Sequence, residues 1–205
     1  MSKKPIIVFE GIECSGKSSH VNNVANYLKN KKIKFLKIRE PGGSVNSEKI
    51  RKLILNNNSN LNKYTDTLLY LSARSENIEL IKANAGKKII LIDRFSDSTI
   101  AYQHYGMGVN LKLIKTINNF LLKDIKVTFT FLNLVNKKNM KKRLSLRNKL
   151  NRYDNFKNVF YDKVQRGFLK IYKKNAKRYM LIDSNLDMNN NKKIVLDRIS
   201  NLIKK

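Results

Sequence analysis

With 205 residues, 41% of them hydrophobic, the chain is long enough to bury the core of one domain, which excludes a disordered protein. No apolar run approaches the roughly 20 residues that cross a bilayer, so we expect no contact with a membrane. The single cysteine excludes an internal disulfide framework and fits a reducing compartment. Because the N-terminus also leaves no room for a secretion signal, we expect a cytoplasmic protein.

The net charge of +28 is typical of proteins that bind nucleic acids, but its distribution is not. The lysines are scattered along the whole chain instead of forming one basic arm, and they accompany many asparagine and isoleucine residues. We interpret this pattern as a bias in residue usage that produces a solvated lysine surface, and we expect no nucleic-acid partner. Such a surface still attracts anionic nucleotides.

The first elements in chain order are a strand, a glycine-rich loop and a helix. Residues 5–9 form an apolar run, residues 11–18 match the phosphate-loop pattern GxxxxGK[ST], and apolar residues then recur at helical spacing. The backbone N–H groups of such a loop surround an anion at a helix N-terminus. Lys17 can reach β- and γ-phosphates, and the Ser18 hydroxyl suits Mg²⁺. We expect a nucleoside triphosphate to contact Gly11, Ile12, Glu13, Cys14, Ser15, Gly16, Lys17, Ser18 and Ser19.

Strand-like and helix-like segments alternate through the rest of the chain. Further strands are expected at residues 33–38, 88–93, 127–132 and 178–183. Helices are expected at residues 48–55, 64–83, 111–122, 137–146 and 155–174, followed by an amphipathic helix near the end of the chain. This alternation predicts one α/β domain over residues 1–205, with a five-stranded parallel sheet, helices on both faces and ligands at the carboxyl ends of the strands.

Polar segments follow the second and third predicted strands. Residues 39–44 form a turn, and Asp93 closes the third strand. A carboxylate at a strand end beside the phosphate loop is well placed to hold Mg²⁺ through water. Arg94 follows where hydrolysing ATPases usually carry a residue that orients water, and an arginine suits a second phosphate group. The pattern therefore favours transfer to a phosphorylated acceptor over hydrolysis.

Four segments together resemble the thymidylate kinase family of nucleoside monophosphate kinases. They are residues 10–19, 39–43, 68–74 and 93–103, in the order of that family. The resemblance implies the P-loop kinase fold and an ATP-dependent enzyme that converts dTMP to dTDP, for dTTP synthesis, by in-line transfer of the γ-phosphoryl group. It also implies Mg²⁺ near Ser18 and Asp93, and a homodimer to which the apolar helix faces between residues 64 and 122 could contribute.

The resemblance assigns the acceptor site residue by residue. Glu13 would accept from the 3′-hydroxyl of a deoxyribonucleotide, and Tyr70 would stack on thymine in place of the usual phenylalanine. One helical turn after Tyr70, Arg74 would contact the base edge. Arg51 and Arg94 would grip the acceptor phosphate. The base and sugar would be read by Ser98, Tyr102 and Gln103, the last having both a donor and an acceptor for a base edge.

A lid at about residues 143–155 completes the resemblance. Its arginines would close over the donor and neutralise the transferring phosphoryl group, with Arg143 and Arg147 on one helix face. The chain departs from the family at Asn151, where an aspartate is usual. Cys14 stands where some thymidylate kinases carry a catalytic arginine, and a thiol cannot supply that charge. The expected catalytic residues are therefore Lys17, Arg94, Arg143, Arg147 and Arg152.

Several alternatives remain open on the sequence. One is the same chemistry on another acceptor, such as dUMP or a deoxynucleoside. A second is a basic P-loop ATPase acting on nucleic acid, which would hydrolyse ATP in response to DNA or RNA with a steep salt dependence. For single residues, Tyr70 also fits a core position, and the lid arginines also fit a solvated basic face.

Overall fold

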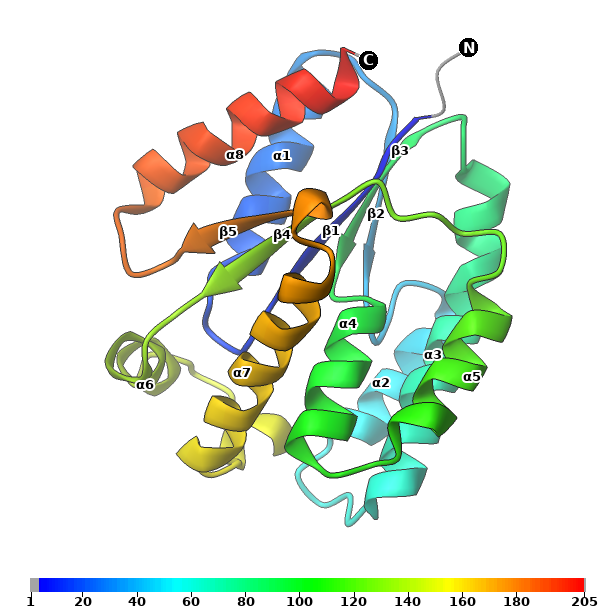
Figure 1. The fold of residues 1–205 in the computed structure, drawn as a ribbon, viewed down its shortest axis with the longest axis vertical. Helices are drawn as coiled ribbons and strands as arrows, with labels where there is room; N and C mark the ends of the chain where they lie inside the picture. Colours follow the sequence, from blue (N-terminus) through cyan, green and yellow to red (C-terminus); the bar gives the residue numbers. More distant parts are fainter. Residues whose placement is uncertain (1–3, 205) are drawn as a thin grey trace.

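A five-stranded sheet forms the centre of the computed structural model, which describes residues 4–204 (Figure 1). All strands are parallel, in the order β2-β3-β1-β4-β5. Their bounds are Ile6–Gly11 for β1, Phe35–Arg39 for β2, Ile89–Asp93 for β3, Phe129–Leu134 for β4 and Tyr179–Asp183 for β5. The predicted α/β class and parallel sheet are confirmed. Residues 1–3, from which we expected a direct lead into the first strand, lie outside the described part, as does residue 205.

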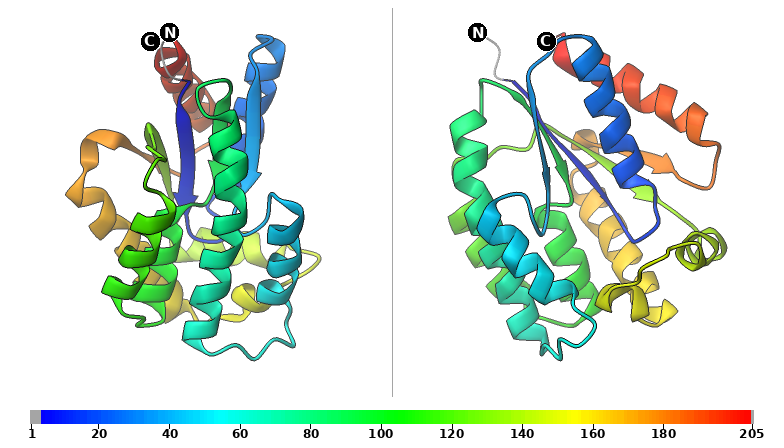
Figure 2. Two further views of the ribbon diagram at one scale, coloured as in Figure 1. Left: turned by 90° about the vertical axis from the view of Figure 1, so that its right-hand side faces the viewer. Right: turned by 180° about the vertical axis from the view of Figure 1, so that it is seen from behind.

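Helices cover both faces of the sheet (Figure 2). Their bounds are Lys17–Asn30 for α1, Val45–Leu55 for α2, Lys63–Asn84 for α3, Leu111–Leu121 for α5, Lys137–Ser145 for α6, Asn158–Lys174 for α7 and Met188–Ile203 for α8. α1 and α8 share one face, whereas α3, α5 and α7 lie on the other. Within residues 4–204, no helix has the length and apolarity needed to cross a membrane.

The central strand β1 is buried along its whole length because it is apolar on both faces. Ile7 and Phe9 pack into the cluster formed with α1 and α8. Ile6 and Val8, pointing the opposite way, pack against Ile78 of α3 and its neighbours. Because side chains alternate between the two faces of a strand, this pattern fixes which residues of β1 reach each layer. The carboxyl end of β1 lies at the middle of the sheet edge because β1 is the central strand.

The structure differs from the predicted elements in several bounds and in one additional helix. α2 begins three residues before its predicted start, and β2 and β4 each begin two residues after theirs. A helix that the sequence did not predict follows Arg94, where α4 (Ser96–Thr99) runs directly into the π-helix η1 (Ile100–Gly106). The helix expected to continue to residue 146 ends at Ser145, as α6. The helix expected from residue 155 begins at Asn158, because a short 3₁₀-helix, η2 (Arg152–Asn155), precedes it. A further 3₁₀ turn, η3 (Ala176–Arg178), leads into β5.

Candidate active site

The phosphate loop joins the carboxyl end of β1 to the N-terminus of α1. Its backbone needs glycine at both ends. A Cβ atom at Gly11, where φ is 140°, would lie 2.3 Å from the carbonyl oxygen of Asn133. Gly16 takes a left-handed φ of 82° immediately before the helix begins. The predicted loop therefore has the tight turn and the helix N-terminus on which anion binding depends.

Lys17 is buried at the start of α1 and is held by neutral groups. Its ammonium donates to the carbonyl oxygen of Ile12 at 2.7 Å and to the hydroxyl of Ser15 at 3.3 Å. Burial, followed by the nearby charge of Arg94, lowers the pKa of Lys17 to about 8. An ammonium held in this way keeps a strong attraction for an anion that enters the loop.

Ser18 and Asp93 meet at the ends of neighbouring elements, as the sequence predicted. The hydroxyl of Ser18 donates to the Oδ2 atom of Asp93 at 2.6 Å. No group of three or more His, Cys, Asp or Glu residues within the described chain forms a metal cage. Mg²⁺ in kinases usually has only one or two protein oxygens and takes its other ligands from phosphates and water. A hydroxyl and a carboxylate at this position fit that donor set.

Arg94 turns from the end of β3 toward the phosphate loop. Its backbone takes a left-handed φ of 66°, an uncommon conformation for a residue with a side chain. The guanidinium donates to the Gly11 carbonyl at 2.7 Å and to the Glu13 carboxylate at 2.9 Å, and it lies over the ring of Tyr102 at 5.0 Å. Glu13 also accepts from the Tyr102 hydroxyl at 2.5 Å. The predicted acceptor cation is thus fixed against the donor loop.

Glu10, the last residue of β1 before Gly11, anchors the segment that follows Arg94. Its buried carboxylate accepts from the N–H of Phe95 at 2.8 Å, the N–H of Ser98 at 3.2 Å and the Ser98 hydroxyl at 2.5 Å. Burial, followed by the charge of Asp97, raises the pKa of Glu10 to about 7. We did not predict a role for Glu10 from the sequence, although a charged residue near the end of an apolar strand indicates one.

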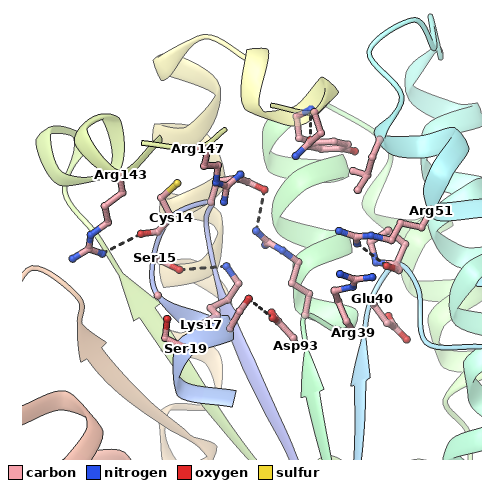
Figure 3. A pocket seen from close by; sticks show the side chains of 18 of the residues that line it. Cys14, Ser15, Lys17, Ser19, Arg39, Glu40, Arg51, Asp93, Arg143 and Arg147 are labelled. Carbon is pink, nitrogen blue, oxygen red and sulfur yellow. Dashed lines mark hydrogen bonds and ion pairs between the residues drawn. The ribbon is translucent and has the colours of Figure 1, made fainter. Parts of the chain in front are cut away.

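A cavity of about 460 Å³ lies beside the phosphate loop (Figure 3); we call it the main cavity. Arg143 lies on one side of it, and Arg39 and Arg51 lie on the other. The guanidinium of Arg51 donates to the Pro41 carbonyl at 2.7 Å, and Arg39 pairs with Glu48 at 3.1 Å. The sequence singled out Arg51 but not Arg39. The other lining residues include Glu13, Cys14, Ser15, Gly16, Lys17, Ser18, Ser19, Tyr70, Asp93, Arg94 and Arg147.

A smaller cavity of about 20 Å³ gathers most of the predicted acceptor residues. It shares Glu13, Tyr70 and Arg94 with the main cavity, so the two adjoin. Its remaining lining residues are Ser98, Tyr102 and Gln103. α4 and η1 therefore carry one side of this cavity, whereas α3 contributes Tyr70 from the other.

Arg74 does not join this group, contrary to the expectation that it would lie with Tyr70. It is 1% exposed, and its guanidinium donates to Glu40 at 2.9 Å and to Asn118 at 2.7 Å. It also packs 5.2 Å from the centre of the Phe95 ring. Residues four apart share a helix face, but a long side chain can still turn to distant partners. Arg74 lines neither cavity in this structure.

The lid arginines occupy three different environments. Arg143, near the end of α6, donates to the carbonyls of Cys14 at 3.0 Å and Ser184 at 2.5 Å. Arg147 pairs with the buried Asp154 at 2.5 Å. The expectation that Arg143 and Arg147 share one helix face is wrong, because α6 ends at Ser145 and the chain turns between them. Both line the main cavity nevertheless.

Arg152 lies away from the lining of the main cavity, contrary to the expectation that it would close over the donor. Its guanidinium pairs with the buried carboxylate of Asp66 and donates to the Ile54 carbonyl at 2.9 Å. Beside it, Asn151 caps η2. The Asn151 side chain accepts from the Tyr153 N–H at 2.9 Å and donates to Asp154 at 2.5 Å. Asparagine therefore serves as the cap at the position where the family usually has aspartate.

Cys14 occupies the outer turn of the phosphate loop, with a left-handed φ of 56°. It lines the main cavity, and burial raises the pKa of its thiol. Because Arg143 donates to the carbonyl of Cys14, the lid reaches the loop at the position where some thymidylate kinases carry an arginine. The cation that the loop lacks is present beside it.

Comparisons with known proteins agree with this geometry. The family described as thymidylate kinase matches residues 9–195. A thymidylate kinase of Thermosipho africanus is 38% identical over 186 residues, covering 90% of this chain and 92% of the relative. One of Mycoplasma capricolum is 35% identical over 202 residues, covering 94% and 95%. The crystal structure of thymidylate kinase from Ehrlichia chaffeensis has a TM-score of 0.77 and 30% identity, covering 96% of this chain and 98% of that chain. This chain therefore belongs to the thymidylate kinase family.

Proposed function

We propose that the main cavity binds ATP and dTMP together and that the γ-phosphoryl group passes in line from one to the other, giving dTDP and ADP. The observation that carries this proposal is the contact between Arg94 and the phosphate loop, 2.7 Å from Nη1 to the Gly11 carbonyl. A cation for the acceptor phosphate thus lies directly beside the donor site. No covalent intermediate with the protein is needed, because positioning and charge neutralisation supply the catalysis.

On the donor side, the loop amides and Lys17 hold the β- and γ-phosphates. Ser18 and Asp93 hold Mg²⁺, directly or through water. When bound, Mg²⁺ neutralises charge on the β- and γ-phosphates. Lys17 does the same from the protein side, since its buried ammonium has neutral partners that a phosphate oxygen can replace.

On the acceptor side, Arg94 and Arg51 hold the phosphate of dTMP. Tyr70 offers a ring face to the base, and Gln103 reads its edge. Glu13 holds Arg94 and Tyr102 in place and lines both cavities, where its carboxylate would accept from a deoxyribose hydroxyl. A general base is not required, because the acceptor phosphate is already ionised near neutral pH.

The lid, at about residues 143–155, contributes Arg143 and Arg147 to the transferring phosphoryl group. Arg143 is held by carbonyls only, so its charge is available without breaking an ion pair. Arg147 must share its charge with Asp154 or leave it. We therefore assign the larger catalytic contribution to Arg143.

The active form is expected to be a cytoplasmic homodimer. Its cytoplasmic location rests on the single cysteine, which fits a reducing compartment. For the dimer, α3 and α5 carry large apolar side chains on the surface, including Leu68 at 49% exposure and Phe120 at 81%. Sedimentation velocity of the wild type and of Phe120→Glu tests this interface. A wild type that sediments as a monomer at micromolar concentration contradicts the dimer.

An assay of ADP release tests the proposed reaction. Wild-type protein receives ATP with dTMP, dUMP, dCMP or thymidine, each with and without Mg²⁺. We expect dTMP-dependent ADP release that requires Mg²⁺, with thymidine inactive because it lacks the acceptor phosphate. ADP release that depends on DNA or RNA, or that is independent of any acceptor, would point to the alternative P-loop ATPase.

A further inference from the structure

Asp66, on α3, is the centre of a buried network that joins the lid to the small cavity. It is 1% exposed. Its carboxylate accepts from the Tyr153 hydroxyl at 2.6 Å and from the Nε2 of Gln103 at 3.1 Å, and it pairs with Arg152. Tyr153 and Arg152 belong to the lid, whereas Gln103 belongs to η1. One carboxylate thus holds three side chains from two separate segments.

The network fixes which way the amide of Gln103 points. An ionised carboxylate only accepts hydrogen bonds, so the group of Gln103 that faces Asp66 must be its NH₂. The Tyr153 hydroxyl donates its hydrogen bond to Asp66, so toward Gln103 it acts as an acceptor. It accepts from the same NH₂ at 3.0 Å. A flipped amide would place its oxygen against two acceptors. Arg152 supplies the countercharge that keeps the carboxylate buried in this role.

The opposite end of the same amide has no partner. Oε1 of Gln103 is buried, and no donor within residues 4–204 reaches it. Gln103 lines the small cavity, whereas Asp66 does not. A buried acceptor without a donor costs free energy, which a ligand that supplies an N–H recovers. A pyrimidine ring is larger than the small cavity, so it reaches Gln103 from the adjoining main cavity.

We propose that Asp66, assisted by Tyr153, is a positioning residue that sets base specificity through Gln103. By holding the amide with Oε1 free, it makes Gln103 an acceptor for the N3–H of a thymine or uracil base. Cytosine has an unprotonated N3, so it would place a lone pair against Oε1 and leave the amide unsatisfied. The inference rests on the proposed function, because it concerns how the proposed site distinguishes dTMP from other nucleoside monophosphates.

The test compares dTMP and dCMP as acceptors for the wild type and for Asp66→Asn. An asparagine at this position presents either an oxygen or an NH₂ to Gln103, so both orientations of the Gln103 amide become acceptable. We expect the ratio of kcat/KM for dTMP to kcat/KM for dCMP to fall about tenfold, which corresponds to losing the preference of one buried hydrogen bond. The KM for ATP should stay unchanged, since the network does not touch the phosphate loop.

Two further variants keep the test decisive. Tyr153→Phe removes one of the two acceptors but retains the Asp66–Arg152 pair, so it should lower the same ratio by a smaller factor even if Asp66→Asn folds poorly. Asp124→Asn changes an exposed carboxylate that pairs with Lys82 at 3.7 Å, and it should leave the ratio at the wild-type value.

A merely structural role for Asp66 would lower the activity with both acceptors equally, and an unchanged ratio in both network variants would overturn the inference. The proposed function fails separately, if the wild type does not phosphorylate dTMP. If the wild type prefers dTMP and the variants show unchanged ratios, the proposed function is supported, and only the role of Asp66 in base specificity is contradicted.

Discussion

The phosphate-loop side and the lid side of the main cavity both present cations, but they hold them differently. Lys17 on the loop side donates to a carbonyl and a hydroxyl. In the lid, Arg147 lines the main cavity and pairs with the buried carboxylate of Asp154. Arg152, which lies outside that lining, pairs with the buried carboxylate of Asp66. Arg143 is the exception on the lid, because it donates to two carbonyls, one of them in the phosphate loop itself.

The type of partner distinguishes cations that are available to bind a ligand from cations that stabilise the fold. A cation with neutral partners exchanges them for phosphate oxygens at little cost, whereas a cation paired with a buried carboxylate leaves an unpaired charge behind when it moves. By this criterion we expect Lys17 and Arg143 to act on the triphosphate and Arg152 to stabilise the lid. Arg94 also pairs with a carboxylate, but its partner Glu13 is partly exposed and lines the main cavity, so Glu13 is not left buried without a partner when a phosphate binds. The following variants test the division, beginning with the largest expected effect.

Lys17→Met removes the ammonium and retains most of the side chain's bulk. We expect kcat to fall about 10²–10³-fold, because a preorganised charge at the transferring group is lost. The free energy of unfolding should not decrease, since no ion pair is broken. Steady-state kinetics and urea unfolding measure the two effects, with Lys29→Met, on the exposed face of α1, as the control. A large loss of stability would place Lys17 among the structural cations instead.

Arg143→Ala and Arg147→Ala form a matched pair within the lid. For Arg143→Ala we expect kcat to fall about 10–100-fold with stability near that of the wild type. For Arg147→Ala we expect the smaller loss of kcat and a decrease of about 1–2 kcal/mol in the free energy of unfolding, because the buried Asp154 loses a charged partner. A larger loss of kcat in Arg147→Ala than in Arg143→Ala would contradict the distinction between ligand-binding and structural cations.

The pH dependence of ATP binding checks the state of Lys17. Because its pKa in the folded protein is about 8, the free enzyme loses this charge as the pH rises through 8. We expect kcat/KM for ATP to fall by up to about tenfold per pH unit above that point. In Lys17→Arg, where the cation does not titrate, this alkaline limb should vanish. An unchanged limb in Lys17→Arg would assign it to another group.

Asn151→Ala tests the cap that shapes the lid and has the smallest expected effect. The free energy of unfolding should decrease by about 1 kcal/mol, the usual cost of losing a cap. Asn151→Asp should not restore it, since a carboxylate cannot donate to Asp154 and adds a like charge beside it. Thermal unfolding of the three proteins measures both. Full stability of Asn151→Asp would show that the family's usual residue serves equally well here.

Much of the fold could be predicted from the sequence because its determinants are local. Strand β3, for example, is five consecutive residues that are buried on both faces, and apolar residues mark it directly. The π-helix η1 escaped prediction for a related reason. Its buried residues Ala101, Tyr102 and Gln103 are consecutive, so they do not show the apolar spacing by which an α-helix is recognised.

The site was predicted where it depends on strand ends and not where it depends on distant pairings. Ser18 and Asp93 were expected to meet, because Ser18 follows β1 through the phosphate loop and Asp93 ends the neighbouring strand β3. The partners of Arg74 and Arg152 could not be predicted, since Glu40 and Asp66 lie 34 and 86 residues away from them in the chain. A pattern of residues predicts which side chains share an edge or a face, but the pairings inside a core depend on how distant elements pack.

Glu10 has a consequence for how this enzyme can change. Its carboxylate, one residue before the end of β1, holds Phe95 and Ser98 at the start of α4, so buried hydrogen bonds join the proposed donor and acceptor sites. We therefore expect motion during turnover in the lid, whose arginines reach the rest of the chain through side-chain hydrogen bonds and ion pairs. Under the proposed function, substitutions away from these hydrogen bonds, as at Gln103 or Asp66, would alter which base is accepted without changing the distance between the donor and acceptor phosphates.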